Sequence, residues 1–109
     1  MSAEFAGSLN QRIELQRLVR DRTAAGLSSR DWETFASCLA SAAPEGAGSE
    51  AEGMTLSALA RYRMVIRART DVRIEQQVRW RGRSFLVKQV IEDPRLPDRM
   101  ELRCEEVRA

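Results

Sequence analysis

Polar and apolar residues alternate near the start of the chain. Ile13 and Leu15 each stand between polar neighbours, which is the two-residue period of a half-buried strand. The pattern continues to about Arg20 and then meets a polar, glycine-containing segment, residues 21–29. We therefore predict a strand that begins near Arg12 and is followed by a loop.

The next segment, residues 28–42, fits two structures. It opens with candidate N-cap residues, Ser28–Asp31, and its large apolar residues then fall on one helical face: Trp32, Phe35 and Leu39. The alternate positions would equally suit a strand: Trp32, Thr34, Ala36, Cys38 and Ala40. The pattern alone favours the helix.

Residues 43–53 have the composition of an irregular loop. Small residues surround one proline, three glycines and three glutamates: Pro44, Glu45, Gly46, Gly48, Glu50, Glu52 and Gly53. Such a segment buries too little apolar surface to fix one conformation by itself. Long loops inside compact domains are uncommon and usually functional or mobile, which makes this segment a candidate functional region. A short helical turn is predicted after it, between Met54 and Leu59.

Strand patterns dominate the second half of the chain. In the first of them, apolar residues face one side and arginines the other: Tyr62, Met64, Ile66 and Ala68 against Arg61, Arg63, Arg67 and Arg69. Three further strands are predicted: Ile74 to Trp80, Phe85 to Ile91 and Met100 to Cys104. Gly82 supplies a tight hairpin turn, and the two prolines of residues 93–98 mark another. Short strands at this spacing predict a small antiparallel β-barrel or sandwich.

Length and composition fit one soluble domain over residues 1–109. Hydrophobic residues make up 43% and charged residues 31%, which is ordinary for a globular protein. No apolar run approaches the roughly 20 residues that span a bilayer. The N-terminus has no basic region followed by an apolar stretch, as a secretory signal would. We expect synthesis in the cytoplasm and no membrane contact.

The side chains that usually carry catalysis are scarce. The chain has no histidine, and Lys88 is its only lysine. Cys38 and Cys104 stand far apart, in no metal-ligand spacing, and are predicted to be buried, reduced thiols. We therefore expect no catalytic residues, no metal and no cofactor, and an enzyme is the least supported class.

Positive charge is concentrated in the middle of the chain, where residues 61–83 hold eight arginines and two carboxylates. The strand-face arginines could contact nucleic-acid phosphates, or form the solvated face of an edge strand. They could also pair with carboxylates within the chain or across a subunit interface, with these candidate partners: Glu75, Glu101 and Glu105. Few aromatic residues are available to stack bases. Trp32 and Trp80 are expected to anchor the core or an interface.

The order of these features resembles a known family. Leu9 to Arg17 is similar to its opening strand, Leu-x-x-Arg-Ile-x-Leu-Gln-Arg, and Trp32 opens an alanine-rich segment that ends at Pro44. A strand of the Tyr-x-Val-x-Ile-Arg type follows, then Trp-x-Gly-x-x-Phe-x-Val-x-x-Val and Met-Glu-Leu-x-Cys-x-Glu: Tyr62–Arg67, Trp80–Val90 and Met100–Glu106. From Leu9 to Val107 the chain resembles the phage head–tail joining proteins. These are also called head-closure or stopper proteins, and they occur in long-tailed phages and gene transfer agents.

The resemblance implies a mainly β protein, a small antiparallel barrel that forms a dodecameric ring in the particle neck. Such a ring has the portal and adaptor on its head side and the tail terminator or tail tube on its tail side. Double-stranded DNA passes through its channel. The resemblance also implies a strand over 32–42, in place of the helix. Residues 44–55 then form a long loop between the second and third strands, which in some members projects into the channel and helps retain DNA.

Two predictions about sites follow from this resemblance. The channel loop comprises Pro44, Glu45, Gly46, Gly48, Glu50, Glu52 and Gly53. The subunit interface is a charged face made of Arg61, Arg63, Arg67, Arg69, Glu101 and Glu105. Two alternatives to a stopper stay open: another neck or tail component, such as an adaptor or tail terminator, and an arginine-rich nucleic-acid-binding module.

Overall fold

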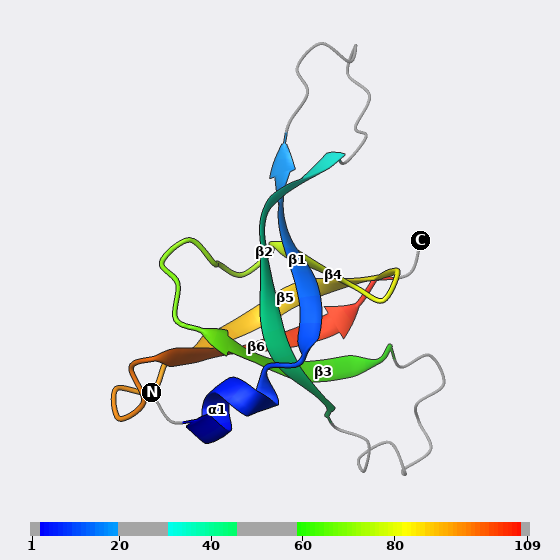
Figure 1. The fold of residues 1–109 in the computed structure, drawn as a ribbon. Helices are drawn as coiled ribbons and strands as arrows, with labels where there is room; N and C mark the ends of the chain where they lie inside the picture. Colours follow the sequence, from blue (N-terminus) through cyan, green and yellow to red (C-terminus); the bar gives the residue numbers. More distant parts are fainter. Residues whose placement is uncertain (1–2, 20–30, 46–58, 108–109) are drawn as a thin grey trace, which may run out of the picture.

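Six antiparallel strands form a closed barrel in a computed structural model that describes residues 3–19, 31–45 and 59–107 (Figure 1). The elements are α1 Ala3–Ser8, β1 Gln11–Val19, β2 Asp31–Pro44, β3 Arg61–Arg67, β4 Gln77–Trp80, β5 Arg83–Ile91 and β6 Arg99–Glu106. Around the barrel the strands follow the order β1-β2-β3-β6-β5-β4. The predicted mainly β, antiparallel barrel is confirmed.

Alternate residues of the strands fill the barrel, as the two-residue period predicts. Nine large side chains are less than 2% exposed: Ile13, Leu15, Met64, Ile66, Val78, Phe85, Val87, Met100 and Leu102. Three aromatic rings close one part of this core, where the Tyr62 centroid lies 5.0 Å from that of Trp80 and 5.5 Å from that of Phe85. Complete burial of one such apolar side chain contributes roughly 1.5–3 kcal/mol.

The barrel closes where β1 meets β4. Only three residue pairs join these strands, with Glu14 to Gln16 on the β1 side. Two side-chain hydrogen bonds reinforce the seam. Buried Gln77 donates from Nε2 to Gln16 Oε1 at 2.6 Å, and Trp80 donates from Nε1 to Gln11 Oε1 at 3.1 Å. The buried amide of Gln77 is therefore satisfied.

β2 is a strand, so the helix favoured by its local pattern is wrong and the strand implied by the resemblance is confirmed. It pairs with β1 over its first ten residues and with β3 over its last five. Leu15 lies opposite Ala36 whereas Gln16 lies opposite Thr34, which leaves Phe35 as the extra residue of a β-bulge. Backbone pairing with two neighbouring strands outweighs the helical preference of the segment.

β4 is shorter than predicted, because the strand does not begin at Ile74. Glu75 has a φ of 73°, which interrupts extended backbone, and the strand starts only at Gln77. The Gln76 side chain closes this turn by accepting a hydrogen bond from the backbone N–H of Arg73 at 2.9 Å. Ile74 is consequently 54% exposed.

The predicted turn at Gly82 is confirmed. Arg81 and Gly82 connect β4 to β5 with φ values of 54° and 75°, as in a type I′ hairpin turn. The turn predicted over residues 93–98 is also present, where the N–H of Leu96 donates to the carbonyl of Asp93 at 2.8 Å.

Helix α1 was not predicted from the sequence. Phe5 and Leu9, which are about 5% exposed, hold the N-terminal segment against the barrel. The Arg99 guanidinium lies 3.9 Å from the centroid of the Phe5 ring, a cation–π contact. Two apolar residues four positions apart are too short a pattern to distinguish a six-residue helix from a loop.

β1 and β2 reach beyond the rest of the barrel, toward the top of Figure 1. β1 pairs with β4 no further than Gln16, and β2 pairs with β3 only from Ala40 onward. Within the described residues, the end of β1 and the start of β2 therefore pair only with each other. We call these two short pieces, Arg17–Val19 and Asp31–Glu33, the hairpin arm.

Candidate functional site

The outward-facing residues of β3 and β6 form one charged strip on the barrel. The two strands pair over their length, and most of their even-numbered residues are buried, including Met64, Ile66, Met100, Leu102 and Cys104. The odd-numbered residues consequently face outward. The register places Arg61 opposite Glu105, Arg63 opposite Arg103, Val65 opposite Glu101 and Arg67 opposite Arg99. We call these eight residues the charged strip.

In the described part of the chain, three ion pairs join the charged strip internally or to Glu45. Arg61 Nε lies 3.9 Å from Glu105, and Arg103 lies 2.9 Å from Glu101 and 3.3 Å from Glu45. The hydrogen bond to Glu101 and then the charge of Glu45 raise the pKa of Arg103. Exposed pairs of this kind stabilise a fold very little, so these charges can change partners at little cost.

The arginines predicted on one strand face have different environments. Arg61 pairs with a predicted carboxylate, whereas Arg63 is exposed and has no ion pair among the described residues. Arg69 lies beyond β3 and donates from Nε and Nη2 to Asp71, both at 2.9 Å, which lowers the pKa of Asp71. Glu75, another predicted partner, lies in the turn before β4. These arginines are therefore part of a surface that carries both positive and negative charges.

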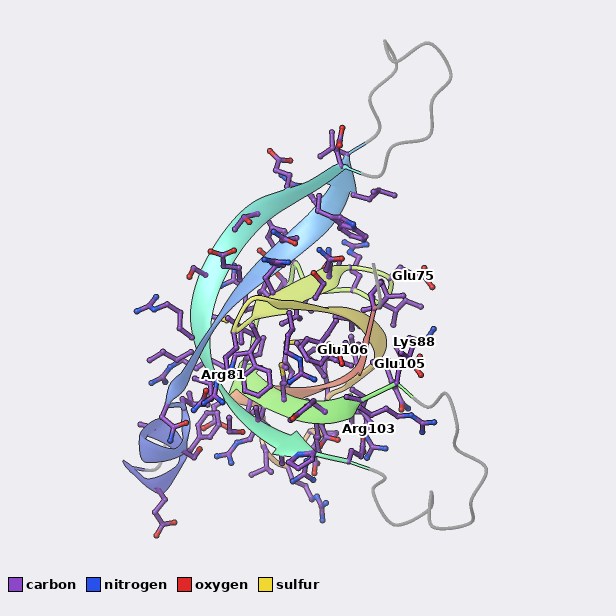
Figure 2. All side chains as sticks on the ribbon, turned by 90° about the vertical axis from the view of Figure 1, so that its right-hand side faces the viewer. Glu75, Arg81, Lys88, Arg103, Glu105 and Glu106 are labelled. Carbon is purple, nitrogen blue, oxygen red and sulfur yellow. The ribbon has the colours of Figure 1, made fainter. Side chains whose placement is uncertain are left out.

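An open hollow of about 670 Å³ borders one end of the charged strip. Figure 2 labels three of its residues on the same side of the molecule, and its full lining is Glu45, Arg61, Lys88, Gln89, Arg103, Cys104 and Glu105. Lys88 and Gln89 were not among the predicted site residues. β5 is bulged between Val87 and Gln89, which leaves Lys88 unpaired with β6. The three-residue step from Val87 to Val90 in the apolar pattern was the sequence signal for this bulge.

The predicted channel loop meets the described structure only at its first residues. Pro44 is the last residue of β2, opposite Tyr62, and the Glu45 N–H donates to the Arg61 carbonyl at 2.9 Å. The backbone N–H of Glu106 likewise donates to the Ala60 carbonyl at 2.8 Å. The other predicted loop residues lie outside the described residues, as does the predicted turn from Met54 to Leu59: Gly46, Gly48, Glu50, Glu52 and Gly53.

Arg83 holds the end of β6 beside the aromatic part of the core. Its guanidinium donates to both carboxylate oxygens of Glu106, at 3.0 and 2.9 Å, and lies over the rings of Tyr62 and Phe85. The hydrogen bond to Glu106 is the largest cause that raises the pKa of Arg83. This bidentate contact holds β6 to the start of β5.

The two thiols differ from each other. Cys104 is buried as predicted, but Cys38 is only half-buried, and both are free. Burial is the main cause that raises the pKa of each thiol, to about 12 for Cys104. Raised pKa values suppress the thiolate form that nucleophilic catalysis needs.

Neither a metal centre nor a membrane-spanning helix is found among the described residues. Among residues 3–19, 31–45 and 59–107, no group of three or more His, Cys, Asp or Glu is placed to hold a metal ion. In the same ranges, no helix has the length and apolar character of a membrane span.

Comparisons with known proteins give one family and two similar solved structures. The family described as phage head completion protein matches residues 6–107. A chain from the virion of a native gene transfer agent particle is 28% identical, with a TM-score of 0.68 and coverage of 93% of this chain and 97% of that one. Protein SF1141 from Shigella flexneri 2a is 25% identical, with a TM-score of 0.67 and coverage of 92% and 94%. Among curated proteins, no match was found.

Proposed function

The chain belongs to the phage head completion protein family, and we propose on this basis that it is a structural protein of the neck of a phage or gene transfer agent particle. Its finer role is that of a head-closure, or stopper, protein that joins the head to the tail and has no enzymatic activity. The observation that carries the proposal is the family match over residues 6–107, supported by the shared barrel of a gene transfer agent virion chain. The protein is made in the cytoplasm of a bacterial host and then enters the particle.

The charged strip supports assembly into a ring between the portal or adaptor and the tail. In a closed ring each subunit presents different surfaces to its two neighbours. Arg61, Arg63 and Arg67 stand beside Glu101 and Glu105 on one face, so a neighbour of matching charge pattern gains specificity from it. The number of subunits, twelve, is what the resemblance implies.

The segment that follows β2 supports a role at the DNA channel. Its start and the strand after it are joined by the backbone hydrogen bond from Glu45 to Arg61, so the barrel holds the two ends together. The carboxylates of Glu50 and Glu52 repel DNA phosphates, which favours sliding over binding, while loops from many subunits crowd the channel. In this proposal, residues 46–53 help retain double-stranded DNA.

Deletion of residues 46–53 tests this role. We expect particles that contain the shortened chain but lose packaged DNA, measured as nuclease-protected DNA per particle. A control chain with Gly-Ser residues in place of 46–53, at equal length, separates crowding from charge, and crowding predicts normal retention. Shortened particles that assemble and retain DNA normally would contradict the channel role.

The two alternatives have less support. For an adaptor we would expect a mainly helical protein, whereas the described residues hold one six-residue helix. A nucleic-acid-binding module needs a basic surface, but Arg61, Arg69 and Arg103 already pair with carboxylates. A chain with both Arg63→Glu and Arg67→Glu distinguishes the module from the structural role. If the double variant blocks particle assembly but leaves the affinity for DNA unchanged, the nucleic-acid-binding module is excluded.

A further inference from the structure

The hairpin arm exposes apolar side chains that a protein normally covers. Leu18 and Val19 are 44% and 39% exposed, and Trp32, directly opposite Leu18, is half-buried. A two-stranded hairpin is marginally stable in water without packing against another element. Because no other strand of the described structure lies beside β1 and β2 here, a surface that packs against the arm would stabilise it.

The charge of the hairpin arm restricts what that surface can be. Glu33 is paired with Arg17 at 3.5 Å, but Asp31 has no ion pair among the described residues. As far as residues 3–19, 31–45 and 59–107 show, the arm therefore presents apolar groups together with one carboxylate that has no ion pair. A fitting partner offers an apolar groove with an uncompensated cation at its edge.

A groove of this chemistry lies on the same chain, between β3, the end of β5 and β6. It has a volume of about 380 Å³, and its apolar lining includes Val65, Ile91 and Leu96, of which Leu96 is 42% exposed. We call it the β3–β5–β6 groove. Arg63 and Arg99 also line it, and Arg99 is paired with Asp98 at 3.0 Å.

The charges around the groove leave Arg63 as the complement of Asp31. The two carboxylates of its lining are already bound: Asp93 pairs with Arg95 at 3.0 Å, and Glu101 pairs with Arg103 at 2.9 Å. Arg63 has no ion pair among the described residues. The apolar side chains of the hairpin arm therefore match the apolar lining of the groove, and the charge of Asp31 is opposite to that of Arg63.

We propose that the hairpin arm of one copy docks into the β3–β5–β6 groove of a second copy. In Figure 1 the arm extends upward, whereas the turn between β5 and β6, which borders the groove, lies at the lower left. An arm cannot fill its own groove across that span, so the contact joins successive copies head to tail. A head-to-tail contact forms a ring when the rotation between successive copies closes, as the proposed neck ring requires. The inference rests on the proposed ring, and it names the surface that forms it.

A photo-crosslinking amino acid at Leu18 tests this docking. It is introduced into the full chain, and both assembled particles and concentrated purified protein are illuminated and analysed by mass spectrometry. We expect links from position 18 to residues that line the groove of another copy, such as Val65 or Leu96. Leu39 is equally exposed at 44% but lies outside the arm, and the same label there is the control that should give no groove link.

The outcomes separate this inference from the proposed function. Particles that contain the chain but link position 18 to another protein, or to no groove residue, overturn the docking and leave the neck role intact. Absence of the chain from particles overturns the neck role, and a groove link in the purified protein would still support the docking. Absence of a groove link in both samples overturns the docking.

A charge exchange provides the second measurement. Asp31→Arg or Arg63→Asp alone is expected to lower ring or particle assembly by about tenfold, equivalent to about 1.4 kcal/mol. The chain with both changes restores the pair and should recover most of the assembly. Double variants no better than the single ones would contradict the pairing of these two residues.

Discussion

Burial gives the two cysteines different chemical properties. Cys104 points into the barrel from β6, and its pKa is raised to about 12, first by burial and then by the Glu45 carboxylate. Cys38 is half-buried, and burial raises its pKa as well. A thiol that stays neutral in the folded protein but ionises in the unfolded chain couples stability to pH.

The Cys104 thiol should weaken the protein at alkaline pH. Its contribution is fully present below about pH 9, the value for an unperturbed thiol, and is lost as the pH rises toward about 12. The free energy of unfolding of the wild type relative to Cys104→Ala should therefore fall by about 1.4 kcal/mol between pH 8 and pH 10. Denaturant unfolding at both pH values measures it. Cys38→Ala, as the control, should keep the part of the pH dependence that comes from Cys104.

Among the elements, the hairpin of β4 and β5 depends on one glycine. Gly82 has a φ of 75°, where an added Cβ is strained even though no atom lies within 4 Å of it. Gly82→Ala should lower the free energy of unfolding by roughly 1–2 kcal/mol. Gly7→Ala is the matched control, because Gly7 lies in α1 with equally open space, and it should raise stability by roughly 0.5–1 kcal/mol. Thermal unfolding of both variants shows whether each change lowers or raises stability. Equal changes in stability for the two variants would contradict the positive φ proposed to matter at Gly82.

The success of sequence reasoning also differed between elements. The two-residue period located β1, β3 and β6, because each has one side facing the core. It did not decide β2, because alternate residues fitted a strand while Trp32, Phe35 and Leu39 also fell on one helical face. It also failed at Glu75, whose positive φ carries no hydrophobic signal. Local patterns miss the places where the backbone departs from regular geometry.

The candidate site followed the same rule. Arg61, Glu101 and Glu105 were predicted on one face, and strand alternation placed them there. Lys88 and Arg103 were missed, since a bulge brings the first to the hollow and the second was not considered as a charge partner. Asp71 pairs with Arg69 in a bend that no periodicity describes. Pairing along regular strands was predictable, whereas contacts made through turns and bulges were not.

At the scale of the whole molecule, stability should be uneven. Barrel strands have neighbours on both sides and a shared core, while the hairpin arm has one strand neighbour per strand. Local opening requires less free energy where few apolar contacts are buried. The arm should therefore open without unfolding of the barrel.

Amide hydrogen exchange measures this difference. Amides of Arg17–Val19 and Asp31–Glu33 should exchange faster, by at least about tenfold, than those of Met64, Ile66 and Leu102 in the free chain. Incorporation into particles should slow the arm amides if the arm is covered there. Uniform protection across arm and barrel in the free protein would contradict the independent opening of the arm.

The backbone hydrogen bond between Glu45 and Arg61 also has an evolutionary consequence. It fixes the distance between the two ends of the intervening segment, with Pro44 and Tyr62 as its last strand pair. Loop-closure entropy grows slowly, by about 0.6 kcal/mol for each doubling of length. Insertions and deletions after Glu45 are therefore nearly neutral for folding of the barrel. Descendants of this chain can change that segment's length and charge to suit a different genome or tail, without redesigning the scaffold that carries it.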